Sequence, residues 1–430
     1  MTWYWPPRGV HSLIIFSFIS LGLYYLSSML TIRTALADED NIQFLHWWNS
    51  AGEVQSIDIL NQYLTQKNLR WNNKEPSYST TAAYLANIAD QLNTTQRPDA
   101  AMMVSSDIIN YDKDFSLLSL DDVAQEQEWE EVIPYAIQDT AKQQGHWISA
   151  PINSHSTNWL WINKKLFSRL SLPEPETWND LITVLEAAKA LGIPTLATLN
   201  DDWEQTLLFE LIVMSTGGLE FYRRFFVDHQ FSDDDQHIIR DSFLRLKQLS
   251  QYFTAVTHET KWHQHTALLA QNKVLMQIHG SWVNSELTTL GAVADHDYLC
   301  LRFPGTQGAY LFHSDHVIFF NEPHNSVQNQ KKLARILLDK EFQRELSIAN
   351  GASPARVDID TDGFNSCSKK SIHDLRMANM RRAVMASLNS KDLFKVVADY
   401  LQDKSSPQTA ANQVITIFTK QPKSPLTNSQ

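Results

Sequence analysis

The chain has 430 residues, which is too long for one ordinary domain and suits two domains or two lobes. Charged residues make up 20% and hydrophobic residues 43%, which argues against extensive disorder and against a polytopic membrane protein. Lys and Arg total 36 against 48 Asp and Glu, and the formal charge of -12 argues against nucleic acid or an anionic membrane as a partner. With 13 Trp, 13 Tyr and only 13 Gly, aromatic faces are a better supplied binding chemistry than glycine-rich phosphate loops.

The N-terminus has the pattern of an export signal. Arg8 precedes an apolar stretch over 13–30, and Ala35-Leu36-Ala37 provides small residues at the spacing that a signal peptidase needs. We therefore expect residues 1–37 to be a signal peptide and Asp38 to begin the mature protein. An uncleaved membrane anchor is the alternative, because the apolar stretch is long and the basic region is thin. No Cys lies directly after that stretch, so we expect no lipoprotein anchor and place the protein in the periplasm.

The only two cysteines are Cys300 and Cys367. Because an exported protein meets an oxidising compartment, we expect them to form a disulfide. By the loop-entropy model, closing so long a loop contributes roughly 4 kcal/mol to stability, less any strain. Two buried free thiols are the alternative.

Strands and helices alternate along the first part of the mature chain. Residues 42–47 are typical of a strand, 53–64 carry apolar residues at helical spacing, 82–92 form a second predicted helix and 98–104 a short buried strand. This alternation predicts an α/β lobe with a mainly parallel sheet.

A second alternating region begins at residue 146. It contains predicted strands at 146–151, 159–162, 298–303, 310–312 and 317–320, and predicted helices at 178–191 and 203–215. From residue 331 the pattern is mostly helical. The region predicts a second α/β lobe.

Motifs of the common enzyme classes are absent from the sequence. It has no glycine-rich phosphate loop, dinucleotide fingerprint, Cys-x-x-Cys pair or Gly-x-Ser-x-Gly elbow. The densest histidine group is His258, His263 and His265, but the spacing from His258 to His263 misses the i, i+4 pairing that places two metal ligands on one helical face. We interpret this group as a solvated or partly packed surface. We expect no catalytic residue, no metal site and no cofactor.

Five blocks of sequence resemble, in the same order, the family 1 extracellular solute-binding proteins of ABC transporters, and most closely the glucose/mannose-binding periplasmic subgroup. They are LHWWNSAGE from Leu45, GHWISAPINSHSTNWLWIN from Gly145, HGSW from His279, RFPGTQGA from Arg302 and GASPAR from Gly351. One block alone is weak, but five ordered blocks cover nearly the whole mature chain and identify it as a member.

The resemblance implies an α/β, two-lobed periplasmic binding-protein fold of type II, with a ligand cleft between lobes that close by hinge bending. The N-terminal lobe is expected to comprise residues 38–152 and 315–360, and the C-terminal lobe residues 153–314 and 361–430. The implied function is that of a monomeric periplasmic protein that binds a neutral monosaccharide of the glucose/mannose type. It would deliver this sugar to the inner-membrane permease of an ABC importer, without catalysis.

A pyranose presents apolar C–H faces and a rim of hydroxyls, so its site needs flat aromatic rings together with amides or carboxylates. Guided by the resemblance, we expect aromatic contacts from Trp47, Trp48, Trp203 and Trp282, with Trp262 as a weaker candidate. Charged acceptors are expected at Glu53 and Asp315, and further polar contacts at Asn153, His155, Asn158 and Asn350. Core packing is the alternative for any single Trp, and satisfaction of the hinge backbone is the alternative for His155 and Asn158.

The chain departs from the subgroup at its cationic positions. The helix expected over 82–92 contains no Lys, Asn350 stands where a second lysine is usual, Ser281 replaces an acidic residue and Ser387 a histidine. Each hydrogen bond lost from a cationic donor costs on the order of 1.5–3 kcal/mol if nothing replaces it. The alternative function is therefore a degenerate solute-binding protein that acts as a sensory or interaction partner of a membrane receptor, with a different ligand or none.

Overall fold

The computed structural model describes residues 1–3, 41–48, 50–71, 73, 81–94, 97–104, 108, 117–254, 261–321, 326–377, 379–382 and 390–419. Most of the predicted signal peptide, its cleavage site and Ser387 lie outside these residues. Within the described ranges, no helix has both the length and the apolar character that crossing a membrane requires.

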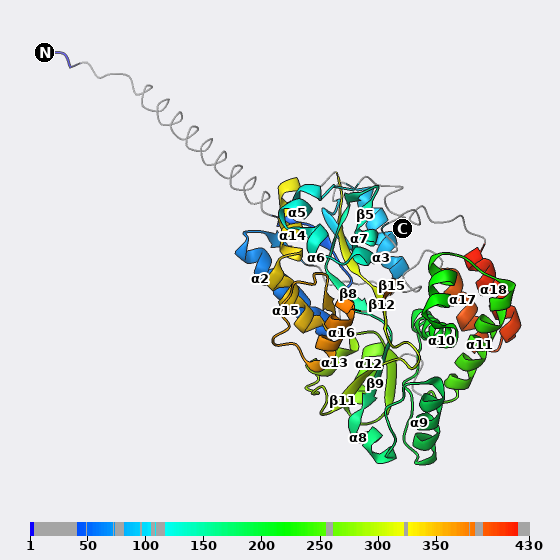
Figure 1. Ribbon diagram of the computed structural model, residues 1–430. Coiled ribbons are helices and arrows are strands. Elements are labelled where there is room, and N and C mark those ends of the chain that lie inside the picture. Colours follow the sequence, from blue (N-terminus) through cyan, green and yellow to red (C-terminus); the bar gives the residue numbers. More distant parts are fainter. Residues whose placement is uncertain are drawn as a thin grey trace.

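The chain forms two α/β lobes (Figure 1). The N-terminal lobe contains a four-stranded sheet in the order β2 (Phe44–Leu45), β4 (Ala100–Val104), β13 (Asp315–Phe319) and β7 (Ser149–Pro151). Strands β2 and β4 are parallel, but β13 runs antiparallel to both of its neighbours. Strands β2, β4 and β7 thus run in one direction, as expected, and β13 alone runs against them, so the sheet is mixed. A βαβ crossover would make a strand parallel to its predecessor in the sheet. Strand β13 enters this sheet directly from the other lobe, without such a crossover, and can therefore run in the opposite direction.

Helices and two small strand pairs complete the N-terminal lobe. The helices are α2 (Ala51–Gln66), α3 (Thr81–Leu92), α5 (Asp121–Glu126), α6 (Trp129–Val132), α7 (Tyr135–Ala141), α14 (Val327–Leu337) and α15 (Lys340–Asn350). The strand pairs are β1 (Asn41–Ile42) with β3 (Arg70–Trp71), and β5 (Lys142–Gln143) with β6 (His146–Trp147). Helix α2 buries Leu60 and Leu64 in the same core as Phe342 and Leu346 of α15, and this shared core joins the two helices.

The C-terminal lobe is built on an antiparallel sheet in the order β10 (Met276–His279), β9 (Trp159–Asn163) and β11 (Tyr298–Arg302). Its α-helices are α8 (Lys164–Phe167), α9 (Trp178–Ala190), α10 (Asp202–Tyr222), α11 (Gln236–Ser250), α12 (Trp262–Ala270), α13 (Val283–Thr289), α16 (Ser366–Met377), α17 (Ser390–Leu401) and α18 (Pro407–Thr419). Short helical turns cover Ser168–Leu170, Arg223–Val227 and Asp233–Asp235. Figure 1 shows α10, α11, α17 and α18 grouped on one side of the molecule, away from α2 and α15.

A third sheet lies between the lobes, in the order β14 (Ser353–Pro354), β8 (Asn153–Ser156), β12 (Ala309–His313) and β15 (Asn379–Arg382). Strand β7 continues into β8 after Ile152, and β12 continues into β13 after Ser314, so the chain passes between the lobes twice at one place. The antiparallel pairing of β8 with β12 sets His155 opposite His313. Polar residues of the two crossing segments therefore lie together at the lobe junction. The exact limits of the two lobes stay a prediction.

Candidate ligand-binding site

Polar side chains of the crossing strands meet at the lobe junction. Asn153 Nδ2 donates to Asp315 Oδ2 at 3.0 Å, and the Asp315 backbone N–H donates to Asn153 Oδ1 at 3.2 Å. His155 Nε2 lies 3.6 Å from Asp315 Oδ2, and its Nδ1 lies 3.1 Å from Ser281 Oγ. All of these residues are buried. The structure thus brings together three predicted site residues, Asn153, His155 and Asp315.

Burial and neighbouring polar groups together set the charges of this cluster. Burial raises the pKa of the Asp315 carboxyl, but the hydrogen bond and charge of His155, with smaller contributions from His313 and Asn153, hold that pKa below its ordinary value. Burial lowers the pKa of His313 to about 4. At neutral pH the junction therefore holds an ionised acceptor beside a neutral imidazole.

His313 was missed by the sequence reasoning. Its Nδ1 has no hydrogen-bond partner among the described residues, and its ring lies 5.3 Å from that of His155 and 5.4 Å from that of Trp282. The available signal was the polar break His313-Ser314-Asp315 inside an otherwise apolar run of strand residues.

An aromatic cluster from the C-terminal lobe adjoins these polar groups. Trp203, Trp262 and Trp282 are each half-buried. The Trp282 ring lies 6.0 Å from that of Trp203, 6.4 Å from that of Trp262 and 5.4 Å from that of His155. Trp282 Nε1 is buried and has no hydrogen-bond partner within the described part of the chain. The cluster combines apolar ring faces with an unused donor, which is the chemistry that a sugar ring requires.

Two predicted aromatic contacts lie instead within the N-terminal lobe. Trp48 is 3% exposed and belongs to the core that contains Leu60 and Phe342. Trp47 is half-buried and packs edge-on against Tyr84, with ring centroids 5.4 Å apart. Neither indole joins the cluster around Trp282.

Three predicted polar residues make local backbone contacts. Glu53 Oε2 accepts from the Ser50 N–H at 2.9 Å and completes a capping box at the start of α2. Asn350 Oδ1 accepts from the Ala352 N–H at 2.9 Å. Asn158 Nδ2 donates to the Ala309 carbonyl at 3.1 Å and so supports the crossing strand β12.

The two lobes touch where α13 begins. The Gly52 N–H in the first turn of α2 donates to Glu286 Oε1 at 3.1 Å, which places a carboxylate at the positive end of that helix. A Cβ atom on Gly52 would lie 1.8 Å from Ser285 Oγ, and one on Gly351 would lie 2.8 Å from the Ser285 backbone nitrogen. Glycine at both positions therefore allows the elements that carry Glu53 and Asn350 to approach the segment that carries Trp282.

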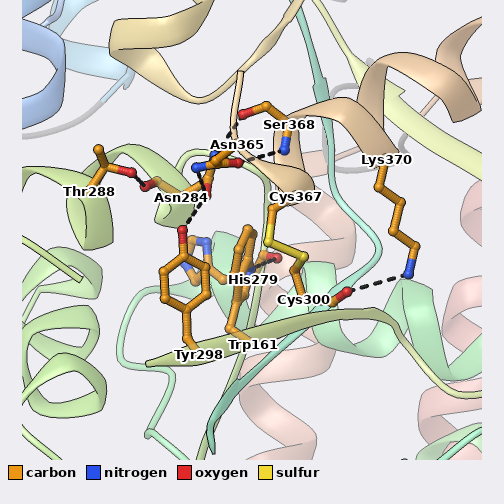
Figure 2. The surroundings of a disulfide bond; sticks show 10 residues. All are labelled: Trp161, His279, Asn284, Thr288, Tyr298, Cys300, Asn365, Cys367, Ser368 and Lys370. Atoms are coloured by element: carbon orange, nitrogen blue, oxygen red, sulfur yellow. Dashed lines mark hydrogen bonds between the residues drawn. A yellow bond between two sulfur atoms is a disulfide. The ribbon is translucent and has the colours of Figure 1, made fainter. Parts of the chain in front are cut away.

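A disulfide lies next to the segment that carries Trp282 and α13. Cys300 of β11 is bonded to Cys367 of α16, which confirms the predicted pair (Figure 2). Next to it, the Asn284 side chain of α13 donates to Ser368 Oγ at 2.8 Å and accepts from the Tyr298 hydroxyl at 2.7 Å. The bond and this network together hold α16, α13 and the sheet of the C-terminal lobe.

The histidine group near residue 260 is only partly described, because His258 lies outside the described residues. His263 is half-buried, whereas His265 is 1% exposed. The interpretation as a surface group is therefore wrong for His265, which faces inward on the buried side of α12 together with Leu269. The described residues contain no group of three or more His, Cys, Asp or Glu side chains that could hold a metal ion.

Comparison with known sequences decides the family. Residues 59–297, more than half of the chain, match the family described as bacterial extracellular solute-binding protein. A "Probable sugar-binding periplasmic protein" from Rhizobium meliloti (strain 1021) is 31% identical over 363 residues, covering 84% of this chain and 87% of the relative. The chain belongs to the bacterial extracellular solute-binding protein family. The family expected from the five sequence blocks is thereby confirmed.

This solute-binding protein is periplasmic and is not an enzyme. The "Glucose-binding protein GlcS" of Saccharolobus solfataricus is 26% identical over 155 residues, which is 35% of this chain and 28% of the relative. Solved structures share its fold: a "Chitin oligosaccharide binding protein" has a TM-score of 0.75 at 18% identity and covers 89% of this chain and 98% of its own. "Maltose bound T. maritima MalE3" has a TM-score of 0.71 at 15% identity, with 88% and 98% covered.

Proposed function

We propose that this solute-binding protein captures a neutral monosaccharide of the glucose/mannose type at the lobe junction and delivers it to the permease of an ABC importer. The observation that carries the proposal is the joint placement of three half-buried indoles and an ionised Asp315. Rings of this kind stack on the C–H faces of a pyranose, and a carboxylate accepts from its hydroxyls.

The unpartnered atoms at the junction support the same proposal. Buried polar atoms are normally hydrogen-bonded, so Trp282 Nε1 and His313 Nδ1 are available to a ligand that reaches between the lobes. Hydroxyl groups suit both, because a hydroxyl accepts from the indole N–H and donates to or accepts from a neutral imidazole. The names of the relatives, "sugar-binding" and "Glucose-binding", agree with this chemistry.

The contact between the lobes supports a closed state, and in this proposal the closed state is the form that the permease recognises. Gly52 and Glu286 belong to different lobes, so their hydrogen bond exists only when these two surfaces meet. A ligand that contacts both lobes would shift the population towards this state.

A degenerate, sensory solute-binding protein is the second candidate. Two observations favour it: Asn350, at the position of a usual lysine, is engaged with the Ala352 backbone, and Trp48 is enclosed in the N-terminal core. On this alternative the closed lobes would be presented to a membrane receptor with another ligand or none.

Titration with sugars distinguishes the two candidates. The protein purified from the periplasm is titrated with glucose, mannose, galactose, xylose and short oligosaccharides, with tryptophan emission and the thermal midpoint as readouts. A sugar present at 100 times its Kd should stabilise the folded state by about 2.7 kcal/mol. A saturable response to a hexose would support the transport proposal. Folded protein that is silent across the panel would contradict it and favour the sensory candidate.

A further inference from the structure

A buried carboxylate–imidazole pair lies beside the three indoles. Glu204 and His279 are each 1% exposed, and His279 Nε2 lies 3.1 Å from Glu204 Oε1. Glu204 belongs to the first turn of α10, whereas His279 is the last residue of β10. The pair therefore fastens a helix to the sheet at the edge of the candidate site.

The imidazole of His279 is held in one tautomer. Its Nδ1 accepts a hydrogen bond from the Gly280 N–H at 3.1 Å, so this nitrogen carries no proton. The hydrogen on Nε2 then donates to Glu204 Oε1. With both ring nitrogens engaged, the plane of the imidazole is fixed.

The carboxylate of Glu204 is engaged on both oxygens. While Oε1 faces His279, Oε2 accepts from the backbone N–H groups of Asn200 at 3.0 Å and Asp201 at 2.9 Å. Burial raises the pKa of this carboxyl, but the hydrogen bond from His279 and the two backbone donors outweigh it and lower the pKa overall. Glu204 is thus ionised at neutral pH. An amide in its place has only one oxygen and cannot serve both sides.

The His279 ring is the common neighbour of the three indoles. It lies 5.2 Å from the ring of Trp203 and 5.1 Å from that of Trp282, edge-on at 84° in both cases, and 5.6 Å from that of Trp262. These indoles come from three different helices or helix starts, at residues 203, 262 and 282, so their mutual orientation is not set by any one element. The backbone also approaches Trp282 closely, because a Cβ atom on Gly280 would lie 2.3 Å from the Trp282 ring.

We propose that Glu204 and His279 form a positioning pair that sets the angles of Trp203, Trp262 and Trp282 in the sugar site. The pair touches no sugar itself. Glu204 orients the imidazole of His279, and the imidazole packs against the three indole rings. This inference rests on the proposed function for its effect on affinity, but its structural part can be measured without any sugar.

The test uses protein labelled with 5-fluorotryptophan and 19F NMR, which gives each of the 11 Trp that follow residue 37 its own resonance. Resonances of the three indoles are assigned with single Trp→Phe variants. His279→Leu removes both hydrogen bonds, Glu204→Gln keeps the shape of the carboxyl, and His279→Gln restores a donor and an acceptor. The matched control is His316→Leu, because His316 is also fully buried and hydrogen-bonded, to Ser149 Oγ at 2.9 Å, but lies in the sheet of the N-terminal lobe.

We expect His279→Leu and Glu204→Gln to move the resonances of Trp203, Trp262 and Trp282 together, and the control to leave these three in place. The Kd for the bound hexose should rise by about tenfold or more in both variants, since displaced contacts lose affinity, and by less than about threefold in the control. His279→Gln should recover most of the loss. If His279→Leu does not fold, Glu204→Gln decides the question by itself.

Unmoved indole resonances in Glu204→Gln, or equal movement in the His316 control, would overturn the positioning role. Absence of sugar binding by the unaltered protein would instead overturn the proposed function, and the 19F comparison would still decide whether the pair positions the rings.

Discussion

Trp48 of the N-terminal lobe and the pair Trp203 and Trp282 of the C-terminal lobe lie in different surroundings. In the N-terminal lobe, Trp48 is enclosed by aliphatic and aromatic core residues and is 3% exposed. In the C-terminal lobe, Trp203 and Trp282 keep part of their surface open and pack edge-on around the polar ring of His279. An indole surrounded by core carbon serves stability, whereas in the proposed function an indole held by a hydrogen-bonded polar ring keeps a face for a ligand. Counting aromatic residues in a sequence does not separate these two uses.

The largest expected effect comes from removing one indole from each lobe. Trp48→Ala should cost about 3–5 kcal/mol of folding stability, because it leaves a large cavity in the core. Trp282→Ala should abolish detectable sugar binding, a loss of about 100-fold or more, while costing less stability since its ring is half-buried. Urea unfolding and calorimetric titration of both variants measure the two quantities.

The expected difference between the two indoles would be contradicted if Trp48 proved to be needed for sugar binding and Trp282 for folding stability. Sugar binding lost in a stable Trp48→Ala protein and retained in Trp282→Ala would place the ligand against the N-terminal lobe instead.

The disulfide tests whether the C-terminal side of the site depends on covalent support. Replacing Cys300 and Cys367 together by Ser removes a bond between residues 67 apart and should lower the free energy of unfolding by about 4 kcal/mol. Because the Asn284 network remains to hold α13, sugar affinity should fall by less than about threefold. Chemical denaturation of the oxidised, reduced and doubly substituted proteins provides the measurement, and a reduced protein as stable as the oxidised one would contradict the expectation.

Acid should weaken both lobes through buried imidazoles. Burial lowers the pKa of His313 at the junction to about 4 and that of His316 in the N-terminal sheet to about 3. The unfolded chain takes up these protons first as the pH falls below about 6.5. Folding stability is therefore lost between that pH and the folded pKa, by on the order of 3–5 kcal/mol for each histidine.

Gln substitutions separate the two histidines. Each variant should show a flatter dependence of unfolding free energy on pH between about 6.5 and 4.5 than the unaltered protein. Only His313→Gln should also change the Kd for sugar, because His313 alone lies beside Trp282. An unchanged pH dependence in both variants would show that other groups are responsible.

The smallest expected effects concern the contact between the lobes. Gly52→Ala places a Cβ atom against Ser285 Oγ, so the lobes should close less completely and the Kd should rise by about tenfold. Glu286→Gln keeps the contact but removes its charge at the helix end, and about a twofold to fivefold loss is expected. The radius of gyration from small-angle X-ray scattering with saturating sugar reports closure directly.

Ser285→Ala combined with Gly52→Ala is the control, since it removes the clashing oxygen and should recover part of the affinity. If the double variant is no better than Gly52→Ala, the loss arises within α2 and not at the junction.

Much of the fold could be predicted from local pattern. The helices expected at 53–64 and 178–191 lie within or one residue beyond α2 and α9, because their apolar residues repeat at helical spacing. The direction of β13 could not be predicted, because it depends on where the chain returns from the other lobe. Asn153, His155 and Asp315 could be named because they flank the crossings. Glu204 and His279 could not be named as a pair, because neither flanks a crossing and no sequence pattern links a helix start to a strand end 75 residues later.

One consequence of the Cys300–Cys367 bond concerns the order of assembly during export. Strands β12 and β13 and helices α14 and α15 all lie in the covalent loop that it closes, so the loop contains an entire excursion of the chain through the N-terminal lobe. The two sulfurs meet natively only after that excursion has returned. The rate at which this pair becomes oxidised therefore reports how fast the lobes join. Trapping the remaining free thiols with an alkylating reagent at intervals during refolding would measure that rate.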